Sequence, residues 1–200
     1  MAELVEFARR HEGVELNLSV HNRGDLLNHL ADNLTDLAIM VRPPEDELTV
    51  AEPFAPHPYV VVAAPDHPLA SRKRIAVSQL ACEPFVVREK GSDTWNSMVE
   101  AFGGHMRELN IAMEIKSTET IKQAVMAGMG LSFLSLHTVG LEVRSGLLHV
   151  LDVQGTPVMR MWNVVHLQSR VLSPAAEAFR CFILERGEAH LAEMFNRVDA

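Results

Sequence analysis

Cysteine is scarce in this chain of 200 residues: Cys82 and Cys181 are the only two, and they lie far apart in the sequence. This scarcity excludes a disulfide-stapled framework, so we interpret both as buried free thiols. Long hydrophobic runs are missing as well, since no stretch approaches the roughly 18–20 apolar residues that span a bilayer. Residues 1–11 are charged and amphipathic, without the apolar core of a signal peptide. We therefore expect a cytoplasmic protein that has no membrane partner.

Basic residues are too few for a nucleic-acid-binding surface. The 18 Lys and Arg residues are outnumbered by 26 Asp and Glu residues, which leaves a formal net charge of −8. Duplex DNA binding rests largely on Lys and Arg side chains that neutralise phosphates, so the chain by itself is not expected to bind DNA. Its hydrophobic content of 48% is ordinary for a globular protein and is enough for one large domain or two small ones.

Motifs typical of catalysis and metal binding are also absent. The ten histidines form no HExxH pattern, and neither cysteine belongs to a CxxC pair. No serine is framed as GxSxG, and there is no Walker A run or dinucleotide-binding GxGxxG. The lone GxG, at residues 128–130, fits a helix C-terminus with Gly128 in a left-handed conformation. We expect no catalytic residue, no bound metal and no cofactor.

What the sequence does contain is an alternation of predicted strands and helices. Period-2 alternation indicates a strand at Val14–Val20, and apolar residues at helical spacing indicate a helix at Gly24–Asn33. The full set of predicted strands is 14–20, 37–41, 48–54, 59–64, 85–87, 111–115, 131–134, 147–151 and 161–167. The predicted helices are 4–13, 24–33, 92–102, 118–127, 136–144 and a last one from residue 173. Such alternation is typical of βαβ units and parallel sheets.

One pattern occurs twice, which indicates two similar lobes. Residues 14–40 and 111–135 both follow the order strand, polar turn, helix, small-residue stop and apolar strand. A polar, proline-containing linker near residue 65 separates the two copies. We predict an α/β fold of two Rossmann-like lobes with a ligand cleft between them, where strand carboxyl ends meet helix N-termini. The predicted limits are 1–64 with 169–200 for lobe one and 65–168 for lobe two.

One constellation has the chemical character of a binding site. Residues 88–94, with the sequence REKGSDT, lie where a predicted strand ends and a helix begins. The unpaired N–H groups and positive dipole end of a helix N-terminus favour an anion. Arg88 adds a guanidinium that can bind carboxylate or phosphate through two hydrogen bonds. The alternative is that Ser92 or Asp93 only caps the helix.

Several stretches of the chain resemble the effector-binding domain of LysR-type transcription regulators. Val60–Ala70 (VVVAAPDHPLA) resembles the crossing strand and DHPLA signature of that family. Asp36–Ile39 resembles the third strand, and Thr118–Leu131 resembles the second-lobe helix and the turn after it. The order and spacing of these segments cover nearly all of the chain. The segments most similar to regulators of Calvin-cycle (RuBisCO) operons are Arg88–Thr94, Ile121–Val125, Leu134–Thr138 and Arg160–His166.

The resemblance implies a non-enzymatic sensor with a fold like that of type 2 periplasmic binding proteins. It implies binding of a small anionic metabolite, either reduced nicotinamide or a phosphorylated carbon metabolite in the RuBisCO subfamily. It also implies an antiparallel homodimer, with residues 4–20 of one chain facing residues 95–115 of the partner, and a tetramer in the full-length protein. DNA would be contacted only through an N-terminal winged helix-turn-helix domain. We expect that domain and the first strand of lobe one to be missing from this chain, either through truncation or because lobe one is built differently.

Motif and resemblance together define a set of candidate residues. Thr118 begins a second helix facing the expected cleft, and Arg42 stands at a strand end of lobe one. The candidate effector-binding residues are Arg42, His57, Arg88, Gly91, Ser92, Asp93, Thr94, Thr118, Glu119 and His137. Two alternative interpretations remain. The chain could be a periplasmic-type solute-binding protein, which has the same architecture, or a small-molecule enzyme that uses the cleft.

Overall fold

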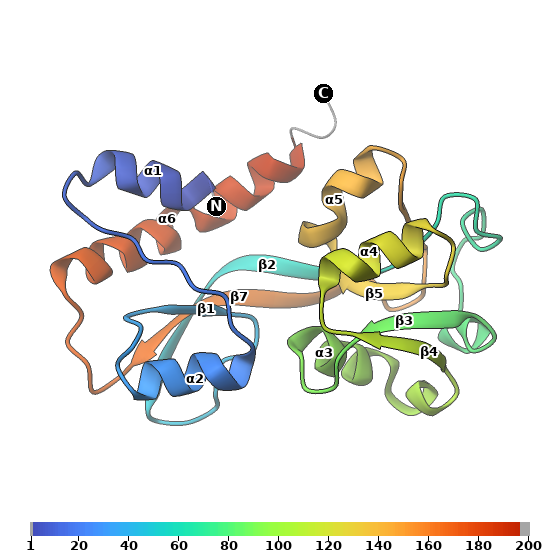
Figure 1. The fold of residues 1–200 in the computed structure, drawn as a ribbon, viewed down its shortest axis with the longest axis horizontal. Helices are drawn as coiled ribbons and strands as arrows, with labels where there is room; N and C mark the ends of the chain where they lie inside the picture. Colours follow the sequence, from blue (N-terminus) through green and yellow to red (C-terminus); the bar gives the residue numbers. More distant parts are fainter. Residues whose placement is uncertain (1, 197–200) are drawn as a thin grey trace. The chain divides into compact units, whose positions relative to one another are not determined.

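The computed structural model describes residues 2–196, and the chain divides into two compact units (Figure 1). The first unit combines the residues up to Pro56 with those from Met161 onward, and the second is His57–Arg160. The predicted limits lie after the ends of two strands, whereas the observed limits fall inside these strands, β2 (Thr49–Ala63) and β7 (Val158–Leu167). Both strands are long enough to take part in each unit.

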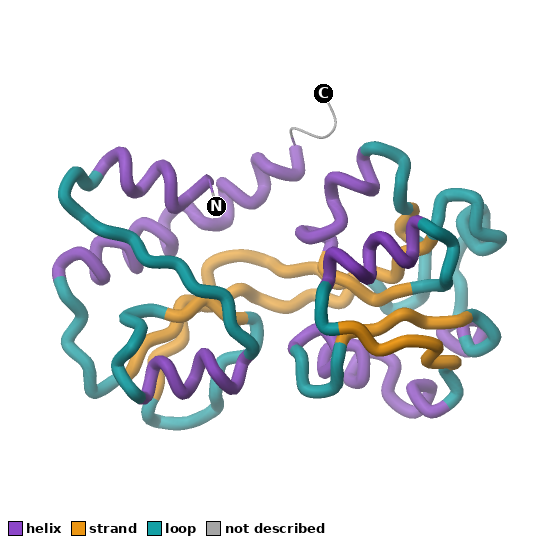
Figure 2. The backbone as a smooth tube through the Cα atoms, viewed as in Figure 1, coloured by secondary structure: helices purple, strands orange, loops and turns teal. Residues whose placement is uncertain are grey.

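The described residues of the first unit form helices at both ends of the chain, and apolar side chains pack beneath them. Its helices are α1 (Ala2–Arg10), α2 (Arg23–Ala31) and α6 (Pro174–Asn196). Strand β1 (Ala38–Met40) pairs antiparallel with β7, which in turn neighbours β2. Leu30 of α2 packs on β1 and β7, and Phe7 of α1 packs against Phe182 and Ile183 of α6. Figure 2 shows α1 and α6 lying side by side.

The second unit combines parallel and antiparallel strand pairs. Its strands, besides the end of β2 and the start of β7, are β3 (Pro84–Arg88), β4 (Asn110–Ile115), β5 (Ser132–Ser135) and β6 (His149–Val150). Its helices are α3 (Asp93–Phe102), α4 (Thr118–Met126) and α5 (Leu136–Arg144), with short 3-10 turns at Val77–Leu80 and Gly103–Arg107. Strands β3 and β4 are parallel, while β2 pairs antiparallel with β5 and β6. The expectation of parallel sheets therefore holds only for β3 and β4 in this unit, whereas β2, β5 and β6 pair antiparallel.

The prediction of a strand at Val14–Val20 is wrong. This segment runs between α1 and α2 without regular structure, and its side chains are largely exposed (Figure 1). Alternation shows which side chains share a face of an extended chain, but a strand also needs a neighbour that completes its hydrogen bonds. Leu16, Leu18 and Val20 are left 36%, 56% and 90% exposed.

The structure also differs from two smaller predictions. The strands predicted at 48–54 and 59–64 are one continuous strand, because the prolines between them remove N–H donors without ending the extended conformation. The two cysteines are free, as expected, but neither is buried: Cys82 is exposed and Cys181 is half-buried. Within residues 2–196, no helix has the length and apolar character that a membrane span requires.

Candidate functional site

Three strands of the second unit end at the same edge, and each runs into a helix. Strand β3 leads to α3, β4 to α4 and β5 to α5. Strands β3 and β4 are parallel, and a parallel bridge between Phe85 and Leu131 aligns the start of β5 with β3. In such sheets, ligands bind outside the carboxyl ends of the strands. We call this region, with its three helix N-termini, the strand-end site.

A serine caps each of the three helices. The hydroxyl oxygen of Ser92 accepts from Trp95 N at 3.2 Å, that of Ser117 from Thr120 N at 3.2 Å, and that of Ser135 from His137 N at 3.1 Å. Ser92 also donates to the carbonyl oxygen of Glu89 at 2.8 Å, so its only proton is already used. Ser92 therefore acts as a helix cap in this structure. The remaining first-turn N–H groups and the dipole of each helix still favour an anion.

Arg88 joins the end of β3 to the beginning of α4. Its Nη1 donates to Thr118 Oγ1 at 3.0 Å. Its Nε and Nη2 donate to the two carboxylate oxygens of Glu89 at 2.7 and 3.0 Å. Burial raises the pKa of the Glu89 carboxyl, but the hydrogen bonds and charge of Arg88 outweigh it, so the pKa is lowered overall. Arg88 is thus held in place by a neighbouring carboxylate.

A pair of histidines lies at the beginning of α5. Tyr59 of β2 is opposite Ser135 of β5, which brings His57 beside His137. The two Nδ1 atoms lie 3.3 Å apart. Burial, followed by the proximity of His137, lowers the pKa of His57 to about 3, and burial also lowers the pKa of His137. Both rings are therefore neutral at pH 7, and one Nδ1 must donate to the other.

Tyr59 is a polar residue of this region that the sequence did not single out. Its ring is 2% exposed and stacks on Phe133 at a centroid distance of 5.3 Å. Burial and the nearby Asp93 raise its pKa, against hydrogen bonds with Thr94 and Ser97 that lower it. The sequence feature that could have identified Tyr59 is its position two residues after His57, which places both side chains on one face of a strand.

The remaining candidates divide between the two units. Gly91, with φ of +90°, forms the turn before α3, and Asp93 is the first residue of that helix. Glu119 of α4 forms an ion pair with Lys122 at 2.7 Å, and its side chain is 65% exposed. Arg42 belongs to the first unit, where its carbonyl oxygen accepts from Arg23 Nε at 2.9 Å. All candidates except Arg42 therefore belong to the second unit, and the binding role of every candidate stays a prediction.

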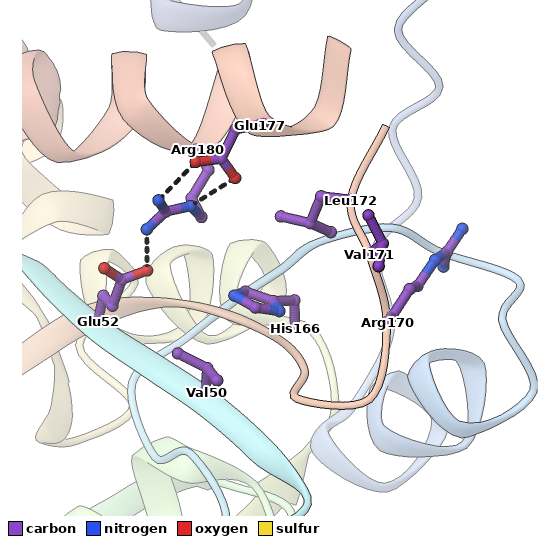
Figure 3. A pocket seen from close by; sticks show the side chains of 8 residues that line it. All are labelled: Val50, Glu52, His166, Arg170, Val171, Leu172, Glu177 and Arg180. Atoms are coloured by element: carbon purple, nitrogen blue, oxygen red, sulfur yellow. Dashed lines mark hydrogen bonds and ion pairs between the residues drawn. The ribbon is translucent and has the colours of Figure 1, made fainter. Parts of the chain in front are cut away.

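A pocket of about 490 Å³ lies in the first unit, and none of these candidates lines it (Figure 3). Strands β2 and β7, the chain before α6 and the first turns of α6 supply its walls. The lining residues are Val50, Glu52, His166, Arg170, Val171, Leu172, Glu177 and Arg180. None of them was predicted as a binding residue. In the described part of the chain, no cluster of three or more His, Cys, Asp or Glu side chains is suited to hold a metal ion.

Sequence comparisons relate the chain to transcription regulators. The model of the LysR substrate binding domain matches residues 2–188. The HTH-type transcriptional regulator CfxR of Cupriavidus necator is 47% identical over 194 residues, which are 97% of this chain and 60% of that protein. The RuBisCO operon transcriptional regulator of Allochromatium vinosum is 44% identical over 178 residues, covering 89% and 59%. The chain thus spans about 60% of the length of these relatives, which are regulators rather than enzymes.

Structural comparisons confirm the predicted α/β fold of the periplasmic-binding-protein type 2 class. The CcmR regulatory domain of Synechocystis PCC6803, in complex with 2-PG (2-phosphoglycolate), is 35% identical with a TM-score of 0.86. The match covers 92% of this chain and 88% of that domain. The effector-binding domain of QuiR in complex with shikimate has a TM-score of 0.82 at 19% identity, over 94% and 90% of the two chains. At that identity, the likeness to QuiR shows the fold alone.

Proposed function

The chain belongs to the LysR substrate-binding domain family, and we propose that it binds a small phosphorylated carboxylate at the strand-end site. The observation that carries this proposal is the position of Arg88, which links the end of β3 to the first residue of α4. A phosphate at that position lies beside a guanidinium and near two helix N-termini. The resemblance to CcmR, whose regulatory domain is in complex with 2-PG, supports the same class of ligand.

The donors that remain at the strand-end site fit such a ligand. A guanidinium has five N–H groups, and three of those of Arg88 are engaged by Glu89 and Thr118. Two are left for ligand oxygens. Thr118 Oγ1 accepts from Arg88, so its own proton is available for a second hydrogen bond to the ligand. Glu89 fixes the guanidinium plane before the ligand arrives.

Binding at this site would regulate the full-length protein by population shift. A ligand that binds one arrangement of the protein more tightly than another favours that arrangement. Because binding and conformation are thermodynamically coupled, the arrangement of a linked DNA-binding domain changes with it. The relative CfxR carries the name of an HTH-type transcriptional regulator, which supports this output for the whole protein.

The test is calorimetric titration with 2-phosphoglycolate. Arg88→Ala should weaken binding about tenfold or more, because a charge-assisted hydrogen bond contributes ~1.5–3 kcal/mol. Arg88→Lys should restore only part of the affinity, since ammonium lacks the planar fork. Thr94→Ala should cost less than Arg88→Ala, and the exposed control Lys73→Ala should bind like wild type.

Thr118→Val provides a second variant for the case in which Arg88→Ala unfolds, because it removes one ligand donor without changing charge. It should weaken 2-phosphoglycolate binding several-fold. Wild-type affinity in both Arg88→Ala and Thr118→Val, or the absence of saturable 2-phosphoglycolate binding to wild type, would overturn the proposal.

The proposed assembly is a homodimer, and a tetramer in the full-length protein. Both surfaces predicted to face each other carry exposed apolar side chains: Leu18 and Val20 in the segment after α1, and Met113 on β4. An antiparallel dimer covers these side chains and typically buries more than about 1,000 Å². Light scattering at tens of micromolar should therefore give the dimer mass. A monomer mass at that concentration would contradict this assembly.

A further inference from the structure

Three consecutive basic residues stand in the connection between β2 and β3 of the second unit (Figure 1). Arg72, Lys73 and Arg74 are the only run of three Lys or Arg residues in a chain that has more acids than bases. All three are exposed, and among the described residues none of their side chains takes part in an ion pair. We call residues 72–74 the basic loop.

The basic loop has a strained backbone. Arg74 has φ of +52°, in the left-handed region that residues other than glycine rarely adopt. A conformation of this kind costs on the order of 1–3 kcal/mol and persists only where the surrounding structure holds it. Three adjacent like charges also repel one another. Two unfavourable terms therefore coincide at the same three residues, and a bound polyanion would offset the second of them.

A neighbouring segment holds this loop in place. Gln154 Nε2 donates to the carbonyl oxygen of Arg74 at 3.0 Å. Ile75, which is 1% exposed, forms a parallel bridge with Val153. Its N–H donates to the carbonyl oxygen of Asp152 at 2.8 Å, and its carbonyl oxygen accepts from Gln154 N at 2.8 Å. Because the backbone is fixed before a partner arrives, less conformational entropy is lost on binding.

Two acids of adjoining segments leave the basic loop positive. Asp152 faces Ile75 through its backbone, and its exposed side chain forms no ion pair with the loop. Asp66 is the one acid of residues 64–76 and stands in an earlier turn of the same connection. Three cations therefore face two acids. Salt screens exposed charges beyond about 8 Å, so acids farther away than that weaken the field at the loop only slightly.

We propose that the basic loop contacts the phosphate backbone of duplex DNA in the full-length regulator. The inference rests on the proposed regulatory function, because a linked DNA-binding domain must hold the duplex near this chain. Such linkage gives a high effective concentration, at which a weak contact suffices. The resemblance to LysR-type regulators implies DNA contact through an N-terminal domain only, so this contact is additional.

The charge density of DNA favours it over an acidic peptide as the partner. Duplex DNA carries one negative charge per about 1.7 Å of its axis, whereas an extended run of acidic residues carries one per about 3.3 Å. Contacts to phosphates position a protein on the duplex without reading its sequence. The basic loop therefore adds affinity but no sequence specificity, and the net charge of −8 keeps binding by the chain alone weak.

The experiment is an NMR titration of this chain with a duplex of about 16 base pairs and arbitrary sequence. At about 20 mM salt, amide shifts should gather at residues 71–75 and 152–154. Contact with three phosphates gives a slope of about −2.7 in log K against log salt, so affinity should fall about twentyfold between about 20 and 60 mM salt. A poly-glutamate peptide of equal charge should bind at least about tenfold more weakly.

Two double variants, each with two fewer positive charges, locate the contact. Arg72→Gln/Lys73→Gln should weaken duplex binding at least about tenfold and reduce the salt slope by about 2. The control Arg9→Gln/Arg107→Gln removes two exposed charges from other surfaces and should keep the wild-type slope. All four side chains are exposed, so both variants should fold like wild type.

The outcomes separate this proposal from the strand-end site. Arg72→Gln/Lys73→Gln should bind 2-phosphoglycolate like wild type, and a duplex contact without any 2-phosphoglycolate binding would contradict the proposed ligand alone. Absence of shifts at residues 71–75, or equal weakening by the control variant, would overturn the DNA contact. Equal affinity for poly-glutamate would also overturn it and would indicate an acidic protein as the partner.

Discussion

The Nδ1 atoms of His57 and His137 lie 3.3 Å apart, at the point where β2 passes the beginning of α5. A hydrogen bond between two neutral rings requires opposite tautomers, with a donor Nδ1 on one ring and an acceptor Nδ1 on the other. His57 is only 3% exposed, so a charge on its ring has little access to water. The pair is therefore a site where protonation opposes folding.

The first prediction concerns stability at mildly acidic pH. The pKa of His57 is lowered from 6.5 to about 3 in the folded state, so the unfolded chain binds the extra proton between these values. The contribution of neutral His57 to the free energy of unfolding is therefore fully present above pH 6.5, and it is lost as the pH falls towards 3. Between pH 7 and 5.5, wild type should lose about 1 kcal/mol that His57→Gln does not lose. Urea unfolding at both pH values measures this difference, and equal losses in the two proteins would contradict it.

The second prediction concerns an ion pair inside the second unit. Lys122 Nζ lies 2.7 Å from Glu142 Oε1, and the two residues are 9% and 8% exposed. Lys122→Met leaves the Glu142 carboxylate buried without its cation and should cost about 3–5 kcal/mol of unfolding free energy. The double variant Lys122→Met/Glu142→Leu should recover most of that loss, because both charges are removed. Denaturant midpoints test this, and a double variant no more stable than the single one would show that packing is responsible.

The third prediction concerns the turn between α4 and β5. Gly130 has φ of +142°, and a Cβ there would lie 2.2 Å from the carbonyl oxygen of Pro84. That oxygen also accepts from Leu131 N at 2.8 Å, so it cannot move without breaking a hydrogen bond between β3 and the residue that precedes β5. Gly130→Ala should lower the unfolding free energy by about 3 kcal/mol. Gly128→Ala, where φ is +78° but no atom lies within 4 Å, should cost only about 1–2 kcal/mol. Thermal unfolding of the two variants should rank them in this order.

The fourth prediction is that this chain does not bind DNA specifically by itself. Its net charge of −8 opposes close approach to phosphates. Fluorescence anisotropy with labelled promoter fragments at physiological salt should show no nanomolar binding. Saturable nanomolar binding to any fragment would refute this expectation.

Much of the second unit could be predicted because local signals there agree with each other. The helix predicted at 118–127 is observed at Thr118–Met126, since Ser117 caps its start and Gly128 follows its end. The prediction of a strand at residues 14–20 failed, because hydrophobic periodicity carries no information about a neighbouring strand that could pair with it. Strand limits that depend on tertiary pairing are therefore the least predictable part of the fold.

The strand-end site was predictable in outline but not in its interactions. A strand, a turn with Gly91 and a serine cap locate Arg88 from the sequence. The interaction of Arg88 with Glu89 depends on the rotamers of two adjacent side chains, which no sequence pattern specifies. The contact of His57 with His137 depends on the register of β2 and β5, across 80 positions of sequence. The pocket around Arg180 escaped prediction for the same reason.

We expect the segment after α1, which forms no strand, to affect how the protein behaves in concentrated solution. Residues 14–20 read VELNLSV, with Glu15 as the one charged side chain and with backbone groups that no strand covers. An exposed, alternating stretch of this kind can add to a strand of a neighbouring molecule and so start β-rich aggregates. Colloidal stability should therefore depend on what covers this segment, and dimerisation would act as protection against precipitation. A charge introduced at Leu18 should then raise the solubility of the monomer while it weakens the dimer.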